Sequence, residues 1–228
     1  MYLVKSFREQ GAIIFLNADH SHSFETAKQA TDAGFDSIHI DLSKQEYEKN
    51  KQETKQVVEY VKSKNADVEV EGELGYLVTD SSKMYDKEIE IPEESYTQPQ
   101  QALEYVNETS VDRFAPAVGN LHGVAKNEPQ LRIELVQEIR KSVPAHIVLV
   151  LHGGSGISEQ GFRLMIQNGF SNIHINTELR VAFSNALRQS LTDQPNEATP
   201  YKYVQPAKQA LVEVAKAKIQ LFGAENKI

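Results

Sequence analysis

Short apolar runs alternate with longer amphipathic segments along the 228 residues of the chain. Several of these runs are continuously apolar, which is typical of strands buried on both faces of a parallel sheet. Because strand–helix alternation produces parallel strands joined by right-handed crossovers, the sequence predicts an α/β fold. We predict six strands, at Ala12–Asn17, Ser37–Ile40, Val68–Glu71, Arg113–Val118, His146–Leu151 and Ile173–Ile175.

The segments between these runs carry helix signals. Ser23 is a candidate N-cap for a helix that ends at Gly34, and Thr97-Gln98-Pro99-Gln100 has the spacing of a capping box. Residues 76–96 are polar and poorly periodic, so we expect a mobile loop or lid there. The predicted helices are Phe24–Ala33, Tyr47–Lys64, Gln101–Glu108, Leu131–Lys141, Gly161–Asn168, Glu178–Leu191 and Pro206–Leu221.

Composition narrows the class of protein. The net charge is −8, and the lysines and arginines are scattered, so the concentrated basic face of a nucleic-acid-binding protein is missing. The absence of cysteine excludes disulfides and thiolate metal ligands. The first residues do not form the apolar stretch of a signal peptide, and no run is long enough to span a membrane. We therefore expect a cytoplasmic protein with no membrane partner.

Three histidines stand in short polar motifs at the ends of predicted strands. His20 follows the first apolar run, His122 lies in Gly119-Asn120-Leu121-His122-Gly123, and His152 directly follows the fifth strand. Since the carboxyl ends of parallel strands meet at one face, the three imidazoles are expected to converge. Three protein ligands with an open fourth position are typical of a catalytic zinc site, although neutral imidazole also suits other divalent ions.

Carboxylates occupy neighbouring positions. Asp19 precedes His20 and could act as a general acid or base, or could instead orient a ligand. Asp41 follows the second predicted strand and Glu73 follows the third. Both are oxygen donors for a second cation or an alternative position of the first. His39 and His146 lie within predicted strands, so we expect structural roles for them.

A glycine-rich turn follows the fifth predicted strand, and a short polar turn follows the sixth. The run Gly153-Gly154-Ser155-Gly156 precedes one predicted helix, and Asn176-Thr177 precedes another. Glycines let backbone N–H groups approach an anion, and a helix N-terminus favours negative charge. In barrels the loops after the last two strands commonly bind phosphate, so these turns predict a phosphate site.

Seven segments resemble, in order and over nearly the whole chain, motifs of the class II, metal-dependent fructose-bisphosphate aldolase family. They are Leu16-Asn17-Ala18-Asp19-His20, Ile38-His39-Ile40-Asp41-Leu42-Ser43, Val70-Glu71-Gly72-Glu73-Leu74-Gly75, Tyr96-Thr97-Gln98-Pro99, Val118-Gly119-Asn120-Leu121-His122-Gly123, Leu151-His152-Gly153-Gly154-Ser155-Gly156 and Asn176-Thr177-Glu178.

The resemblance implies a TIM-type (β/α)₈ barrel that cleaves a ketose 1,6-bisphosphate, foremost fructose 1,6-bisphosphate, into dihydroxyacetone phosphate and glyceraldehyde 3-phosphate. It implies His20, His122 and His152 as zinc ligands, with Asp41 and Glu73 near a second cation position. It implies that Asp19 accepts and returns the proton of the substrate hydroxyl at the C3–C4 bond that is cleaved. It places the phosphate against Gly123, Gly153, Ser155 and Thr177, with Asn176 alongside, and puts His174 where the family usually has a substrate-contacting asparagine.

The chain departs from the family pattern at its start. Family members carry two further strand–helix units before the segment that matches Asp19-His20, so we expect residues 1–228 to form a single, incomplete barrel domain with six of eight strands. Such a barrel leaves sheet edges exposed, and a homodimer or higher oligomer would cover them. The alternatives are a tagatose-bisphosphate aldolase, a non-catalytic metal- and phosphosugar-binding remnant, and a metal-dependent hydrolase.

Overall fold

A computed structural model describes residues 2–225 of the chain. Within these residues the strands are β1 (Asn17–Ser21), β2 (Ser37–Ile40), β3 (Glu69–Leu74), β4 (Arg113–Pro116), β5 (Val148–Leu151) and β6 (Phe170–Ile173). The helices are α1 (Tyr2–Glu9), α2 (Phe24–Asp32), α3 (Tyr47–Lys64), α4 (Pro99–Thr109), α5 (Ile133–Ser142), α6 (Glu159–Gln167), α7 (Thr177–Asp193), α8 (Pro200–Tyr203) and α9 (Gln205–Leu221), with a 3₁₀ turn η1 at Glu93–Ser95.

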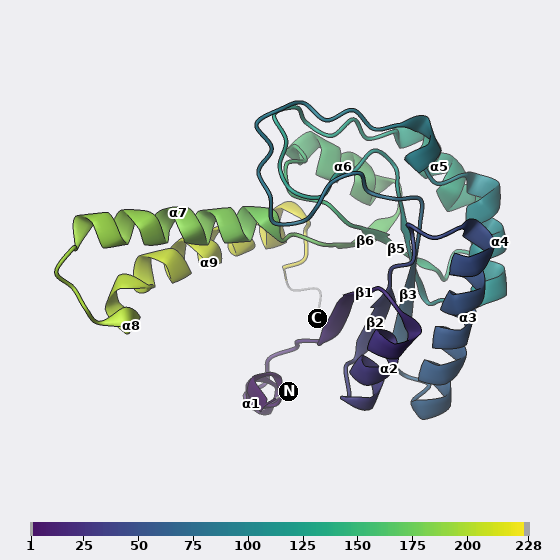
Figure 1. The fold of residues 1–228 in the computed structure, drawn as a ribbon, viewed down its shortest axis with the longest axis horizontal. Helices are drawn as coiled ribbons and strands as arrows, with labels where there is room; N and C mark the ends of the chain where they lie inside the picture. Colours follow the sequence, from purple (N-terminus) through teal and green to yellow (C-terminus); the bar gives the residue numbers. More distant parts are fainter. Residues whose placement is uncertain (1, 226–228) are drawn as a thin grey trace.

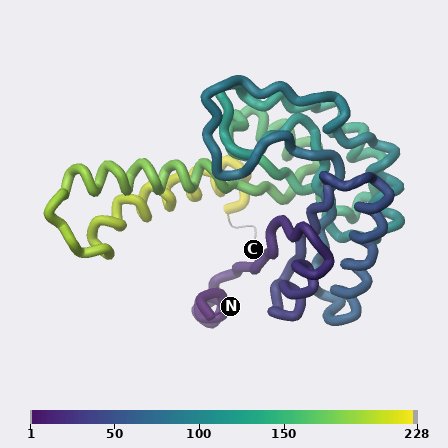
Figure 2. The backbone as a smooth tube through the Cα atoms, in the orientation of Figure 1, coloured from purple at the N-terminus to yellow at the C-terminus, as the bar shows by residue number. Residues whose placement is uncertain are grey.

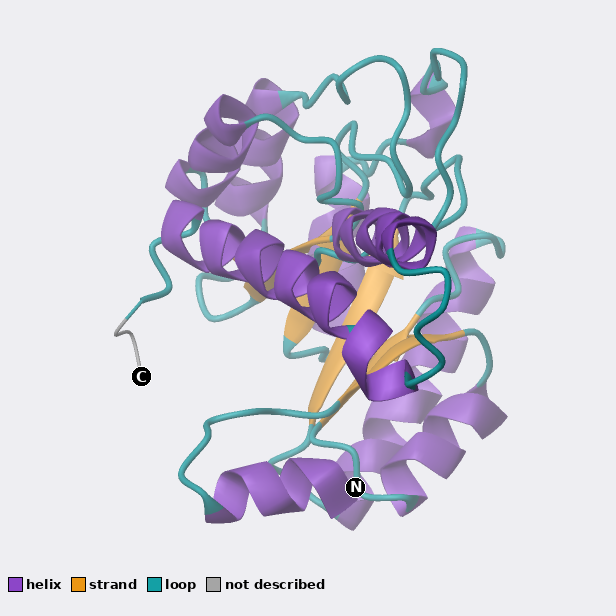
Figure 3. Cartoon of the chain, turned by 90° about the vertical axis from the view of Figure 1, so that its left-hand side faces the viewer, coloured by secondary structure: helices purple, strands orange, loops and turns teal. Residues whose placement is uncertain are grey.

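The six strands form one parallel sheet in the order β1-β2-β3-β4-β5-β6, as the sequence predicts. The sheet is curled, so the chain forms the larger part of a TIM-type barrel that is open between β6 and β1. Helices α2 to α5 pack against one another in sequence order along the outside of the strands (Figure 1). Figure 3 shows the connecting loops gathered at one end of the sheet, where the strands finish.

The core lies between the strands and this outer layer of helices. Side chains from β2, β4 and β5, such as Ile38, Phe114 and Leu149, are fully buried. They meet helix residues spaced three or four positions apart, among them Val57 and Val61 on α3. Burying each such side chain contributes about 1.5–3 kcal/mol, so this interface holds the strand ends, and whatever they carry, in fixed positions.

The prediction of the first strand is wrong in position. Residues 12–16 are not part of the sheet, and Phe15 and Ile13 are largely exposed. Pairing begins at Asn17, which lies opposite Ser37 at the start of β2. Because β2 is only four residues long, the apolar run before Asn17 extends past the end of its partner and finds no strand to pair with.

The predicted capping box at Thr97 is also wrong. The N-cap of α4 is Gln98, whose side chain makes no capping hydrogen bond. The Thr97 hydroxyl instead donates to the Leu74 carbonyl, and its oxygen accepts from the Ala117 N–H at 2.8 Å. Thr97 therefore ties the ends of β3 and β4 together, a long-range role that local spacing does not reveal.

Helices α7 and α9 pack on each other and form an arm that projects away from the sheet (Figure 2). α1 and the short α8 were not predicted, and neither buries a residue completely. None of the helices within residues 2–225 is both long and apolar enough to cross a membrane.

Candidate metal and phosphate site

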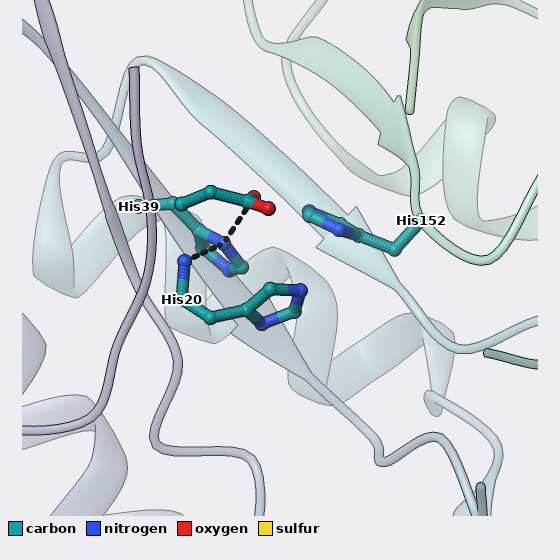
Figure 4. A group of neighbouring side chains, drawn as sticks. His20, His39 and His152 are labelled. Atoms are coloured by element: carbon teal, nitrogen blue, oxygen red, sulfur yellow. Dashed lines mark hydrogen bonds and ion pairs between the residues drawn. The ribbon is translucent and has the colours of Figure 1, made fainter. Parts of the chain in front are cut away.

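The first histidine of the site sits on an irregularity in β1. The register between β1 and β2 shifts between Ala18 and Ser21, and His20 between them has a left-handed backbone with φ of 53°. This conformation costs a residue with a side chain about 1–2 kcal/mol. The backbone N–H of His20 donates to Nδ1 of the buried His39 at 3.2 Å, which holds the bulge in place (Figure 4).

The three histidines that the sequence singled out lie together at the carboxyl ends of the strands. The His20 ring centroid is 4.8 Å from that of His152 and 5.0 Å from that of His122, and the last two are 6.2 Å apart. An ion about 2 Å from one nitrogen of each ring, at tetrahedral angles, places ring centroids about 5 Å apart. The spacing of the rings is therefore close to that of a three-imidazole metal site.

The distances between individual candidate ligand atoms distinguish the histidines from one another. One ligand atom from each of Asp19, His20, His39 and His152 lies within 4.8 Å of the others, and the same holds for His20, Asp41 and Glu73. Among the described residues no such group of three or more includes His122. The His122 ring is thus beside the cluster, while its nitrogens are turned further from the other donors than those of His20 and His152.

Asp41 and Glu73 lie next to His20. Asp41 Oδ2 is 2.8 Å from His20 Nδ1, and Asp41 Oδ1 accepts from the Ser43 hydroxyl at 2.6 Å. Burial would raise the pKa of Asp41, but the hydrogen bonds from His20 and Ser43 outweigh burial and hold its pKa below the usual range. Burial and the nearby Asp41 raise the pKa of Glu73, whose Oε2 is 4.0 Å from His20 Nδ1.

The donor set fits a divalent metal ion. Glu71 Oε2 is buried and accepts no hydrogen bond among the described residues. Burial also lowers the pKa of His122 to about 4 and that of His152 to about 3, so both rings are neutral near pH 7. Neutral imidazoles with carboxylate oxygens at this spacing suit zinc and related ions, and an added positive charge would stabilise the buried carboxylates.

Asp19 lies at the edge of the same cluster and is about half exposed. Its Oδ1 is 3.4 Å from His174 Nδ1 and 3.7 Å from His39 Nδ1. Burial would raise the pKa of Asp19, but the His174 and His39 imidazoles outweigh burial and lower it well below its usual range. Asp19 is therefore a carboxylate that faces both solvent and the imidazoles.

The predicted phosphate residues gather beside the imidazoles, at the N-terminus of α7. The small cavity there, of about 30 Å³, is lined by the glycine-rich turn after β5, by Asn176 and Thr177, and by Asp19, His122 and His174. The Ser155 hydroxyl accepts from the Glu178 N–H, and the Thr177 hydroxyl accepts from the N–H of Ser82 at 3.1 Å. The Asn176 amide donates to the Ser81 hydroxyl at 2.9 Å, so the segment between β3 and α4 fills the space in front of this helix end.

A larger cavity lies on the other side of the same segment. It measures about 760 Å³ and is lined by residues that include Lys44, Tyr47, Asn50 and Tyr76. No imidazole lines it, so its size does not make it the place of metal chemistry. It adjoins the cluster through Ser43, which hydrogen-bonds Asp41.

Two buried members of the cluster were not identified from the sequence. His39, expected to be structural, lies 3.2 Å from Glu73 Oε2 through its Nε2 and contacts His20 through its Nδ1. Glu71 was not singled out, yet its Oε1 is 2.6 Å from His152 Nε2. The signal that could have found them is charge at alternate positions of strands that are otherwise apolar. His146 lies away from the cluster, beside the start of β5.

Comparison with known proteins agrees with this arrangement. The family model described as fructose-bisphosphate aldolase class-II matches residues 1–227. A fructose-bisphosphate aldolase of Staphylococcus aureus is 38% identical over 214 residues, which cover 94% of this chain and 72% of that protein. One from Geobacillus stearothermophilus is 36% identical over 214 residues, with 94% and 71% covered.

Solved structures agree with the fold. The YdjI aldolase from Escherichia coli K12 superposes with a TM-score of 0.74 at 33% identity and covers 92% of this chain and 70% of its own. A fructose-bisphosphate aldolase from Campylobacter jejuni has the same fold, with a TM-score of 0.77 at 19% identity and coverage of 97% and 73%.

The chain belongs to the class II fructose-bisphosphate aldolase family. Members of this family are lyases with a TIM-type fold, and the family is generally zinc-dependent. The predicted family, fold class and enzyme class are therefore confirmed. The predicted site residues lie close together, and their individual roles stay predictions.

Proposed function

We propose that the protein is a zinc-dependent aldolase that reversibly cleaves fructose 1,6-bisphosphate into dihydroxyacetone phosphate and glyceraldehyde 3-phosphate. The observation that carries the proposal is the convergence of His20, His122 and His152, whose ring centroids are 4.8–6.2 Å apart. Asp19 and the N-terminus of α7 lie beside them. The family and the names of its relatives support the same reaction.

His20, His122 and His152 would hold the ion, with Asp41 and Glu73 beside a second cation position. A bound zinc ion supplies a Lewis acid that stabilises the negative charge left on the substrate oxygens when the carbon–carbon bond breaks. The role of the three imidazoles would be to stay neutral and to present one ring nitrogen each to the ion. Burial, which lowers the pKa of His122 and His152, supports that role.

Asp19 would handle the proton. In cleavage the hydroxyl on the carbon that becomes the aldehyde must lose its proton, and in condensation the new alkoxide must gain one. Asp19 is half exposed beside the imidazoles, so a substrate hydroxyl can reach its carboxylate. His174, 3.4 Å away, would orient this carboxylate and contact the substrate.

The phosphate of the dihydroxyacetone half would lie against Gly123, Gly153, Ser155 and Thr177, with Asn176 alongside. A cavity of about 30 Å³ has room for about one water molecule, so substrate binding must open it. The contacts that would break are those from Ser81 and Ser82 to Asn176 and Thr177. We therefore propose that residues 76–96 act as a lid over the phosphate site.

Two further features belong to the proposal. β1 and β6 each pair on one side only within residues 2–225, and a second copy of the chain that covers these edges would give a homodimer or higher oligomer. A cysteine-free chain also fits a reducing cytoplasm.

The test is to purify the chain, measure bound zinc, and assay aldol cleavage of fructose 1,6-bisphosphate before and after removal of metal with a chelator. The proposal expects stoichiometric zinc and cleavage that is lost with the metal and restored by zinc. A parallel assay with tagatose 1,6-bisphosphate distinguishes the two epimers. Stoichiometric zinc without turnover of either sugar would indicate the non-catalytic alternative, and cleavage that survives metal removal would contradict the zinc mechanism.

A further inference from the structure

Glu71 makes the shortest contact to any of the three candidate zinc-binding imidazoles. It lies on β3, is fully buried, and points into the barrel together with Glu73, because alternate residues of a strand share a face. Its Oε1 is 2.6 Å from Nε2 of His152, whose side chain is 3% exposed. The neighbouring Glu69 is part-exposed and pairs with Arg113 instead.

Hydrogen-bond chemistry fixes which atom carries the proton in this contact. Two imidazole nitrogens face Glu71 Oε1, His152 Nε2 at 2.6 Å and His39 Nε2 at 3.7 Å, and a glutamate side chain is ordinarily a carboxylate near neutral pH. An ionised carboxylate can only accept hydrogen bonds, so Nε2 of His152 must be the donor. In a neutral ring with its proton on Nε2, the free lone pair is on Nδ1.

We infer that Glu71 is a positioning residue: it holds His152 in the Nε2–H form, so that Nδ1 is the atom presented to the metal ion. The inference rests on the proposed function, because it requires His152 to bind the ion. His152 faces His20 and His39 across a common space (Figure 4), and these residues contribute ligand atoms that lie within 4.8 Å of one another. Carboxylates that orient metal-binding histidines in this way also raise the basicity of the ring, and their loss typically weakens metal binding 10–100-fold.

Loss of the Glu71 carboxylate would leave the proton position of the His152 ring undetermined. If the carboxylate were replaced by an amide, the ring could take either proton position, and only one of these leaves Nδ1 free. The substitution changes no side-chain volume of consequence, so it tests the hydrogen bond rather than the packing. Glu69 offers a matched control on the same strand, since Glu69→Gln also removes one carboxylate charge but lies away from His152.

The experiment compares zinc dissociation constants of the wild-type chain, Glu71→Gln and Glu69→Gln, measured by competition with a chromogenic chelator, with urea midpoints as the check on folding. We expect Glu71→Gln to bind zinc 10–100-fold more weakly and Glu69→Gln to bind it as the wild type does. The same pair of variants in a His152→Ala background should show no further loss from Glu71→Gln. ¹⁵N NMR of the metal-free wild-type protein should find the His152 proton on Nε2.

Zinc affinity of Glu71→Gln within twofold of the wild type would overturn the inference. So would an equal loss with and without His152, or a His152 proton on Nδ1 in the metal-free wild-type protein. Each of these results leaves the zinc site itself intact. Failure of the wild-type chain to bind zinc at all would overturn the proposed function and this inference together.

Discussion

Replacing Gly72 by alanine should loosen the strand that carries Glu71 and Glu73. Gly72 lies between them on β3 and faces the opposite way, toward the helices. A Cβ built at this position lies 2.6 Å from Tyr105 Oη and 2.8 Å from Tyr105 Cε1. Tyr105 is fully buried on α4 and donates to Asn50 Oδ1 or Thr54 Oγ1, at 3.1 and 2.9 Å, so its ring has no free space to move into.

The magnitude follows from these contacts. Overpacking of a buried site costs about 1–3 kcal/mol. Displacing the Tyr105 hydroxyl loses hydrogen bonding worth about 1 kcal/mol or more. Alanine recovers about 0.5–1 kcal/mol, because glycine loses more backbone freedom when the strand forms. We therefore expect Gly72→Ala to lower the free energy of unfolding by about 1–3.5 kcal/mol. It should also weaken zinc binding, because Glu71 and Glu73 move with the strand.

The assay is urea unfolding of the wild type, Gly72→Ala, Tyr105→Phe and the double variant. Tyr105→Phe alone should cost about 1–2 kcal/mol, since it removes a buried hydrogen bond without leaving a large cavity. The loss of free energy of unfolding in the double variant should be about 1 kcal/mol smaller than the sum of the two single losses, because the missing hydroxyl relieves the closest contact. Additive losses, or a Gly72→Ala protein as stable as the wild type, would refute this account of why glycine stands at position 72.

Three other outcomes are expected. Asp19→Asn should keep its zinc and cleave the substrate at least about 100-fold more slowly, as expected for loss of a general acid–base group. Cleavage rate and zinc content are measured on the same sample. A wild-type rate would exclude Asp19 from the mechanism. Burial lowers the pKa of His122 to about 4, whereas this histidine has an ordinary pKa near 6.5 in the unfolded chain. Between these two pH values the unfolded chain is protonated at His122 and the folded chain is not. The free energy of unfolding of the metal-free protein should therefore fall as the pH is lowered from 7 to 5. His122→Gln should reduce that fall by about 2 kcal/mol. An equal pH dependence of the wild type and His122→Gln would contradict a buried neutral ring at this position. Gly153 has φ of 62°, and a Cβ there would collide with the Leu121 carbonyl. Gly156 has φ of 90°, but a Cβ there would make only ordinary contacts, the nearest with Val124 Cγ1 at 3.9 Å. Gly153→Ala should lose at least about 2 kcal/mol more in urea unfolding than Gly156→Ala, and equal losses would show that backbone strain alone explains both.

Local sequence signals were reliable where the physical cause is local. Helix α3 begins and ends at the predicted residues, Tyr47 and Lys64, and Ser23 caps α2 by accepting from the Thr26 N–H. The parallel direction of the strands also followed from the alternation of strands and helices, because a crossover helix leaves parallel pairing as the outcome. The expectation that the histidines His20, His122 and His152 would meet needed nothing more than their places after strands.

Long-range contacts determined the rest. The first strand begins at Asn17 rather than Ala12 because β2 offers no partner earlier, and no property of residues 12–16 contains that information. His39 and Glu71 read as ordinary residues of buried strands until β2, β3 and β5 are side by side, since a partner 81 positions away in the chain decides what Glu71 does. The sequence alone therefore pointed to the family, through its resemblance to seven motifs, and to the parallel strands and the group of histidines, because these depend on local pattern. The tertiary structure alone decided strand register, the left-handed bend at His20 and the buried partners of each imidazole, because these depend on which distant side chains share the same space.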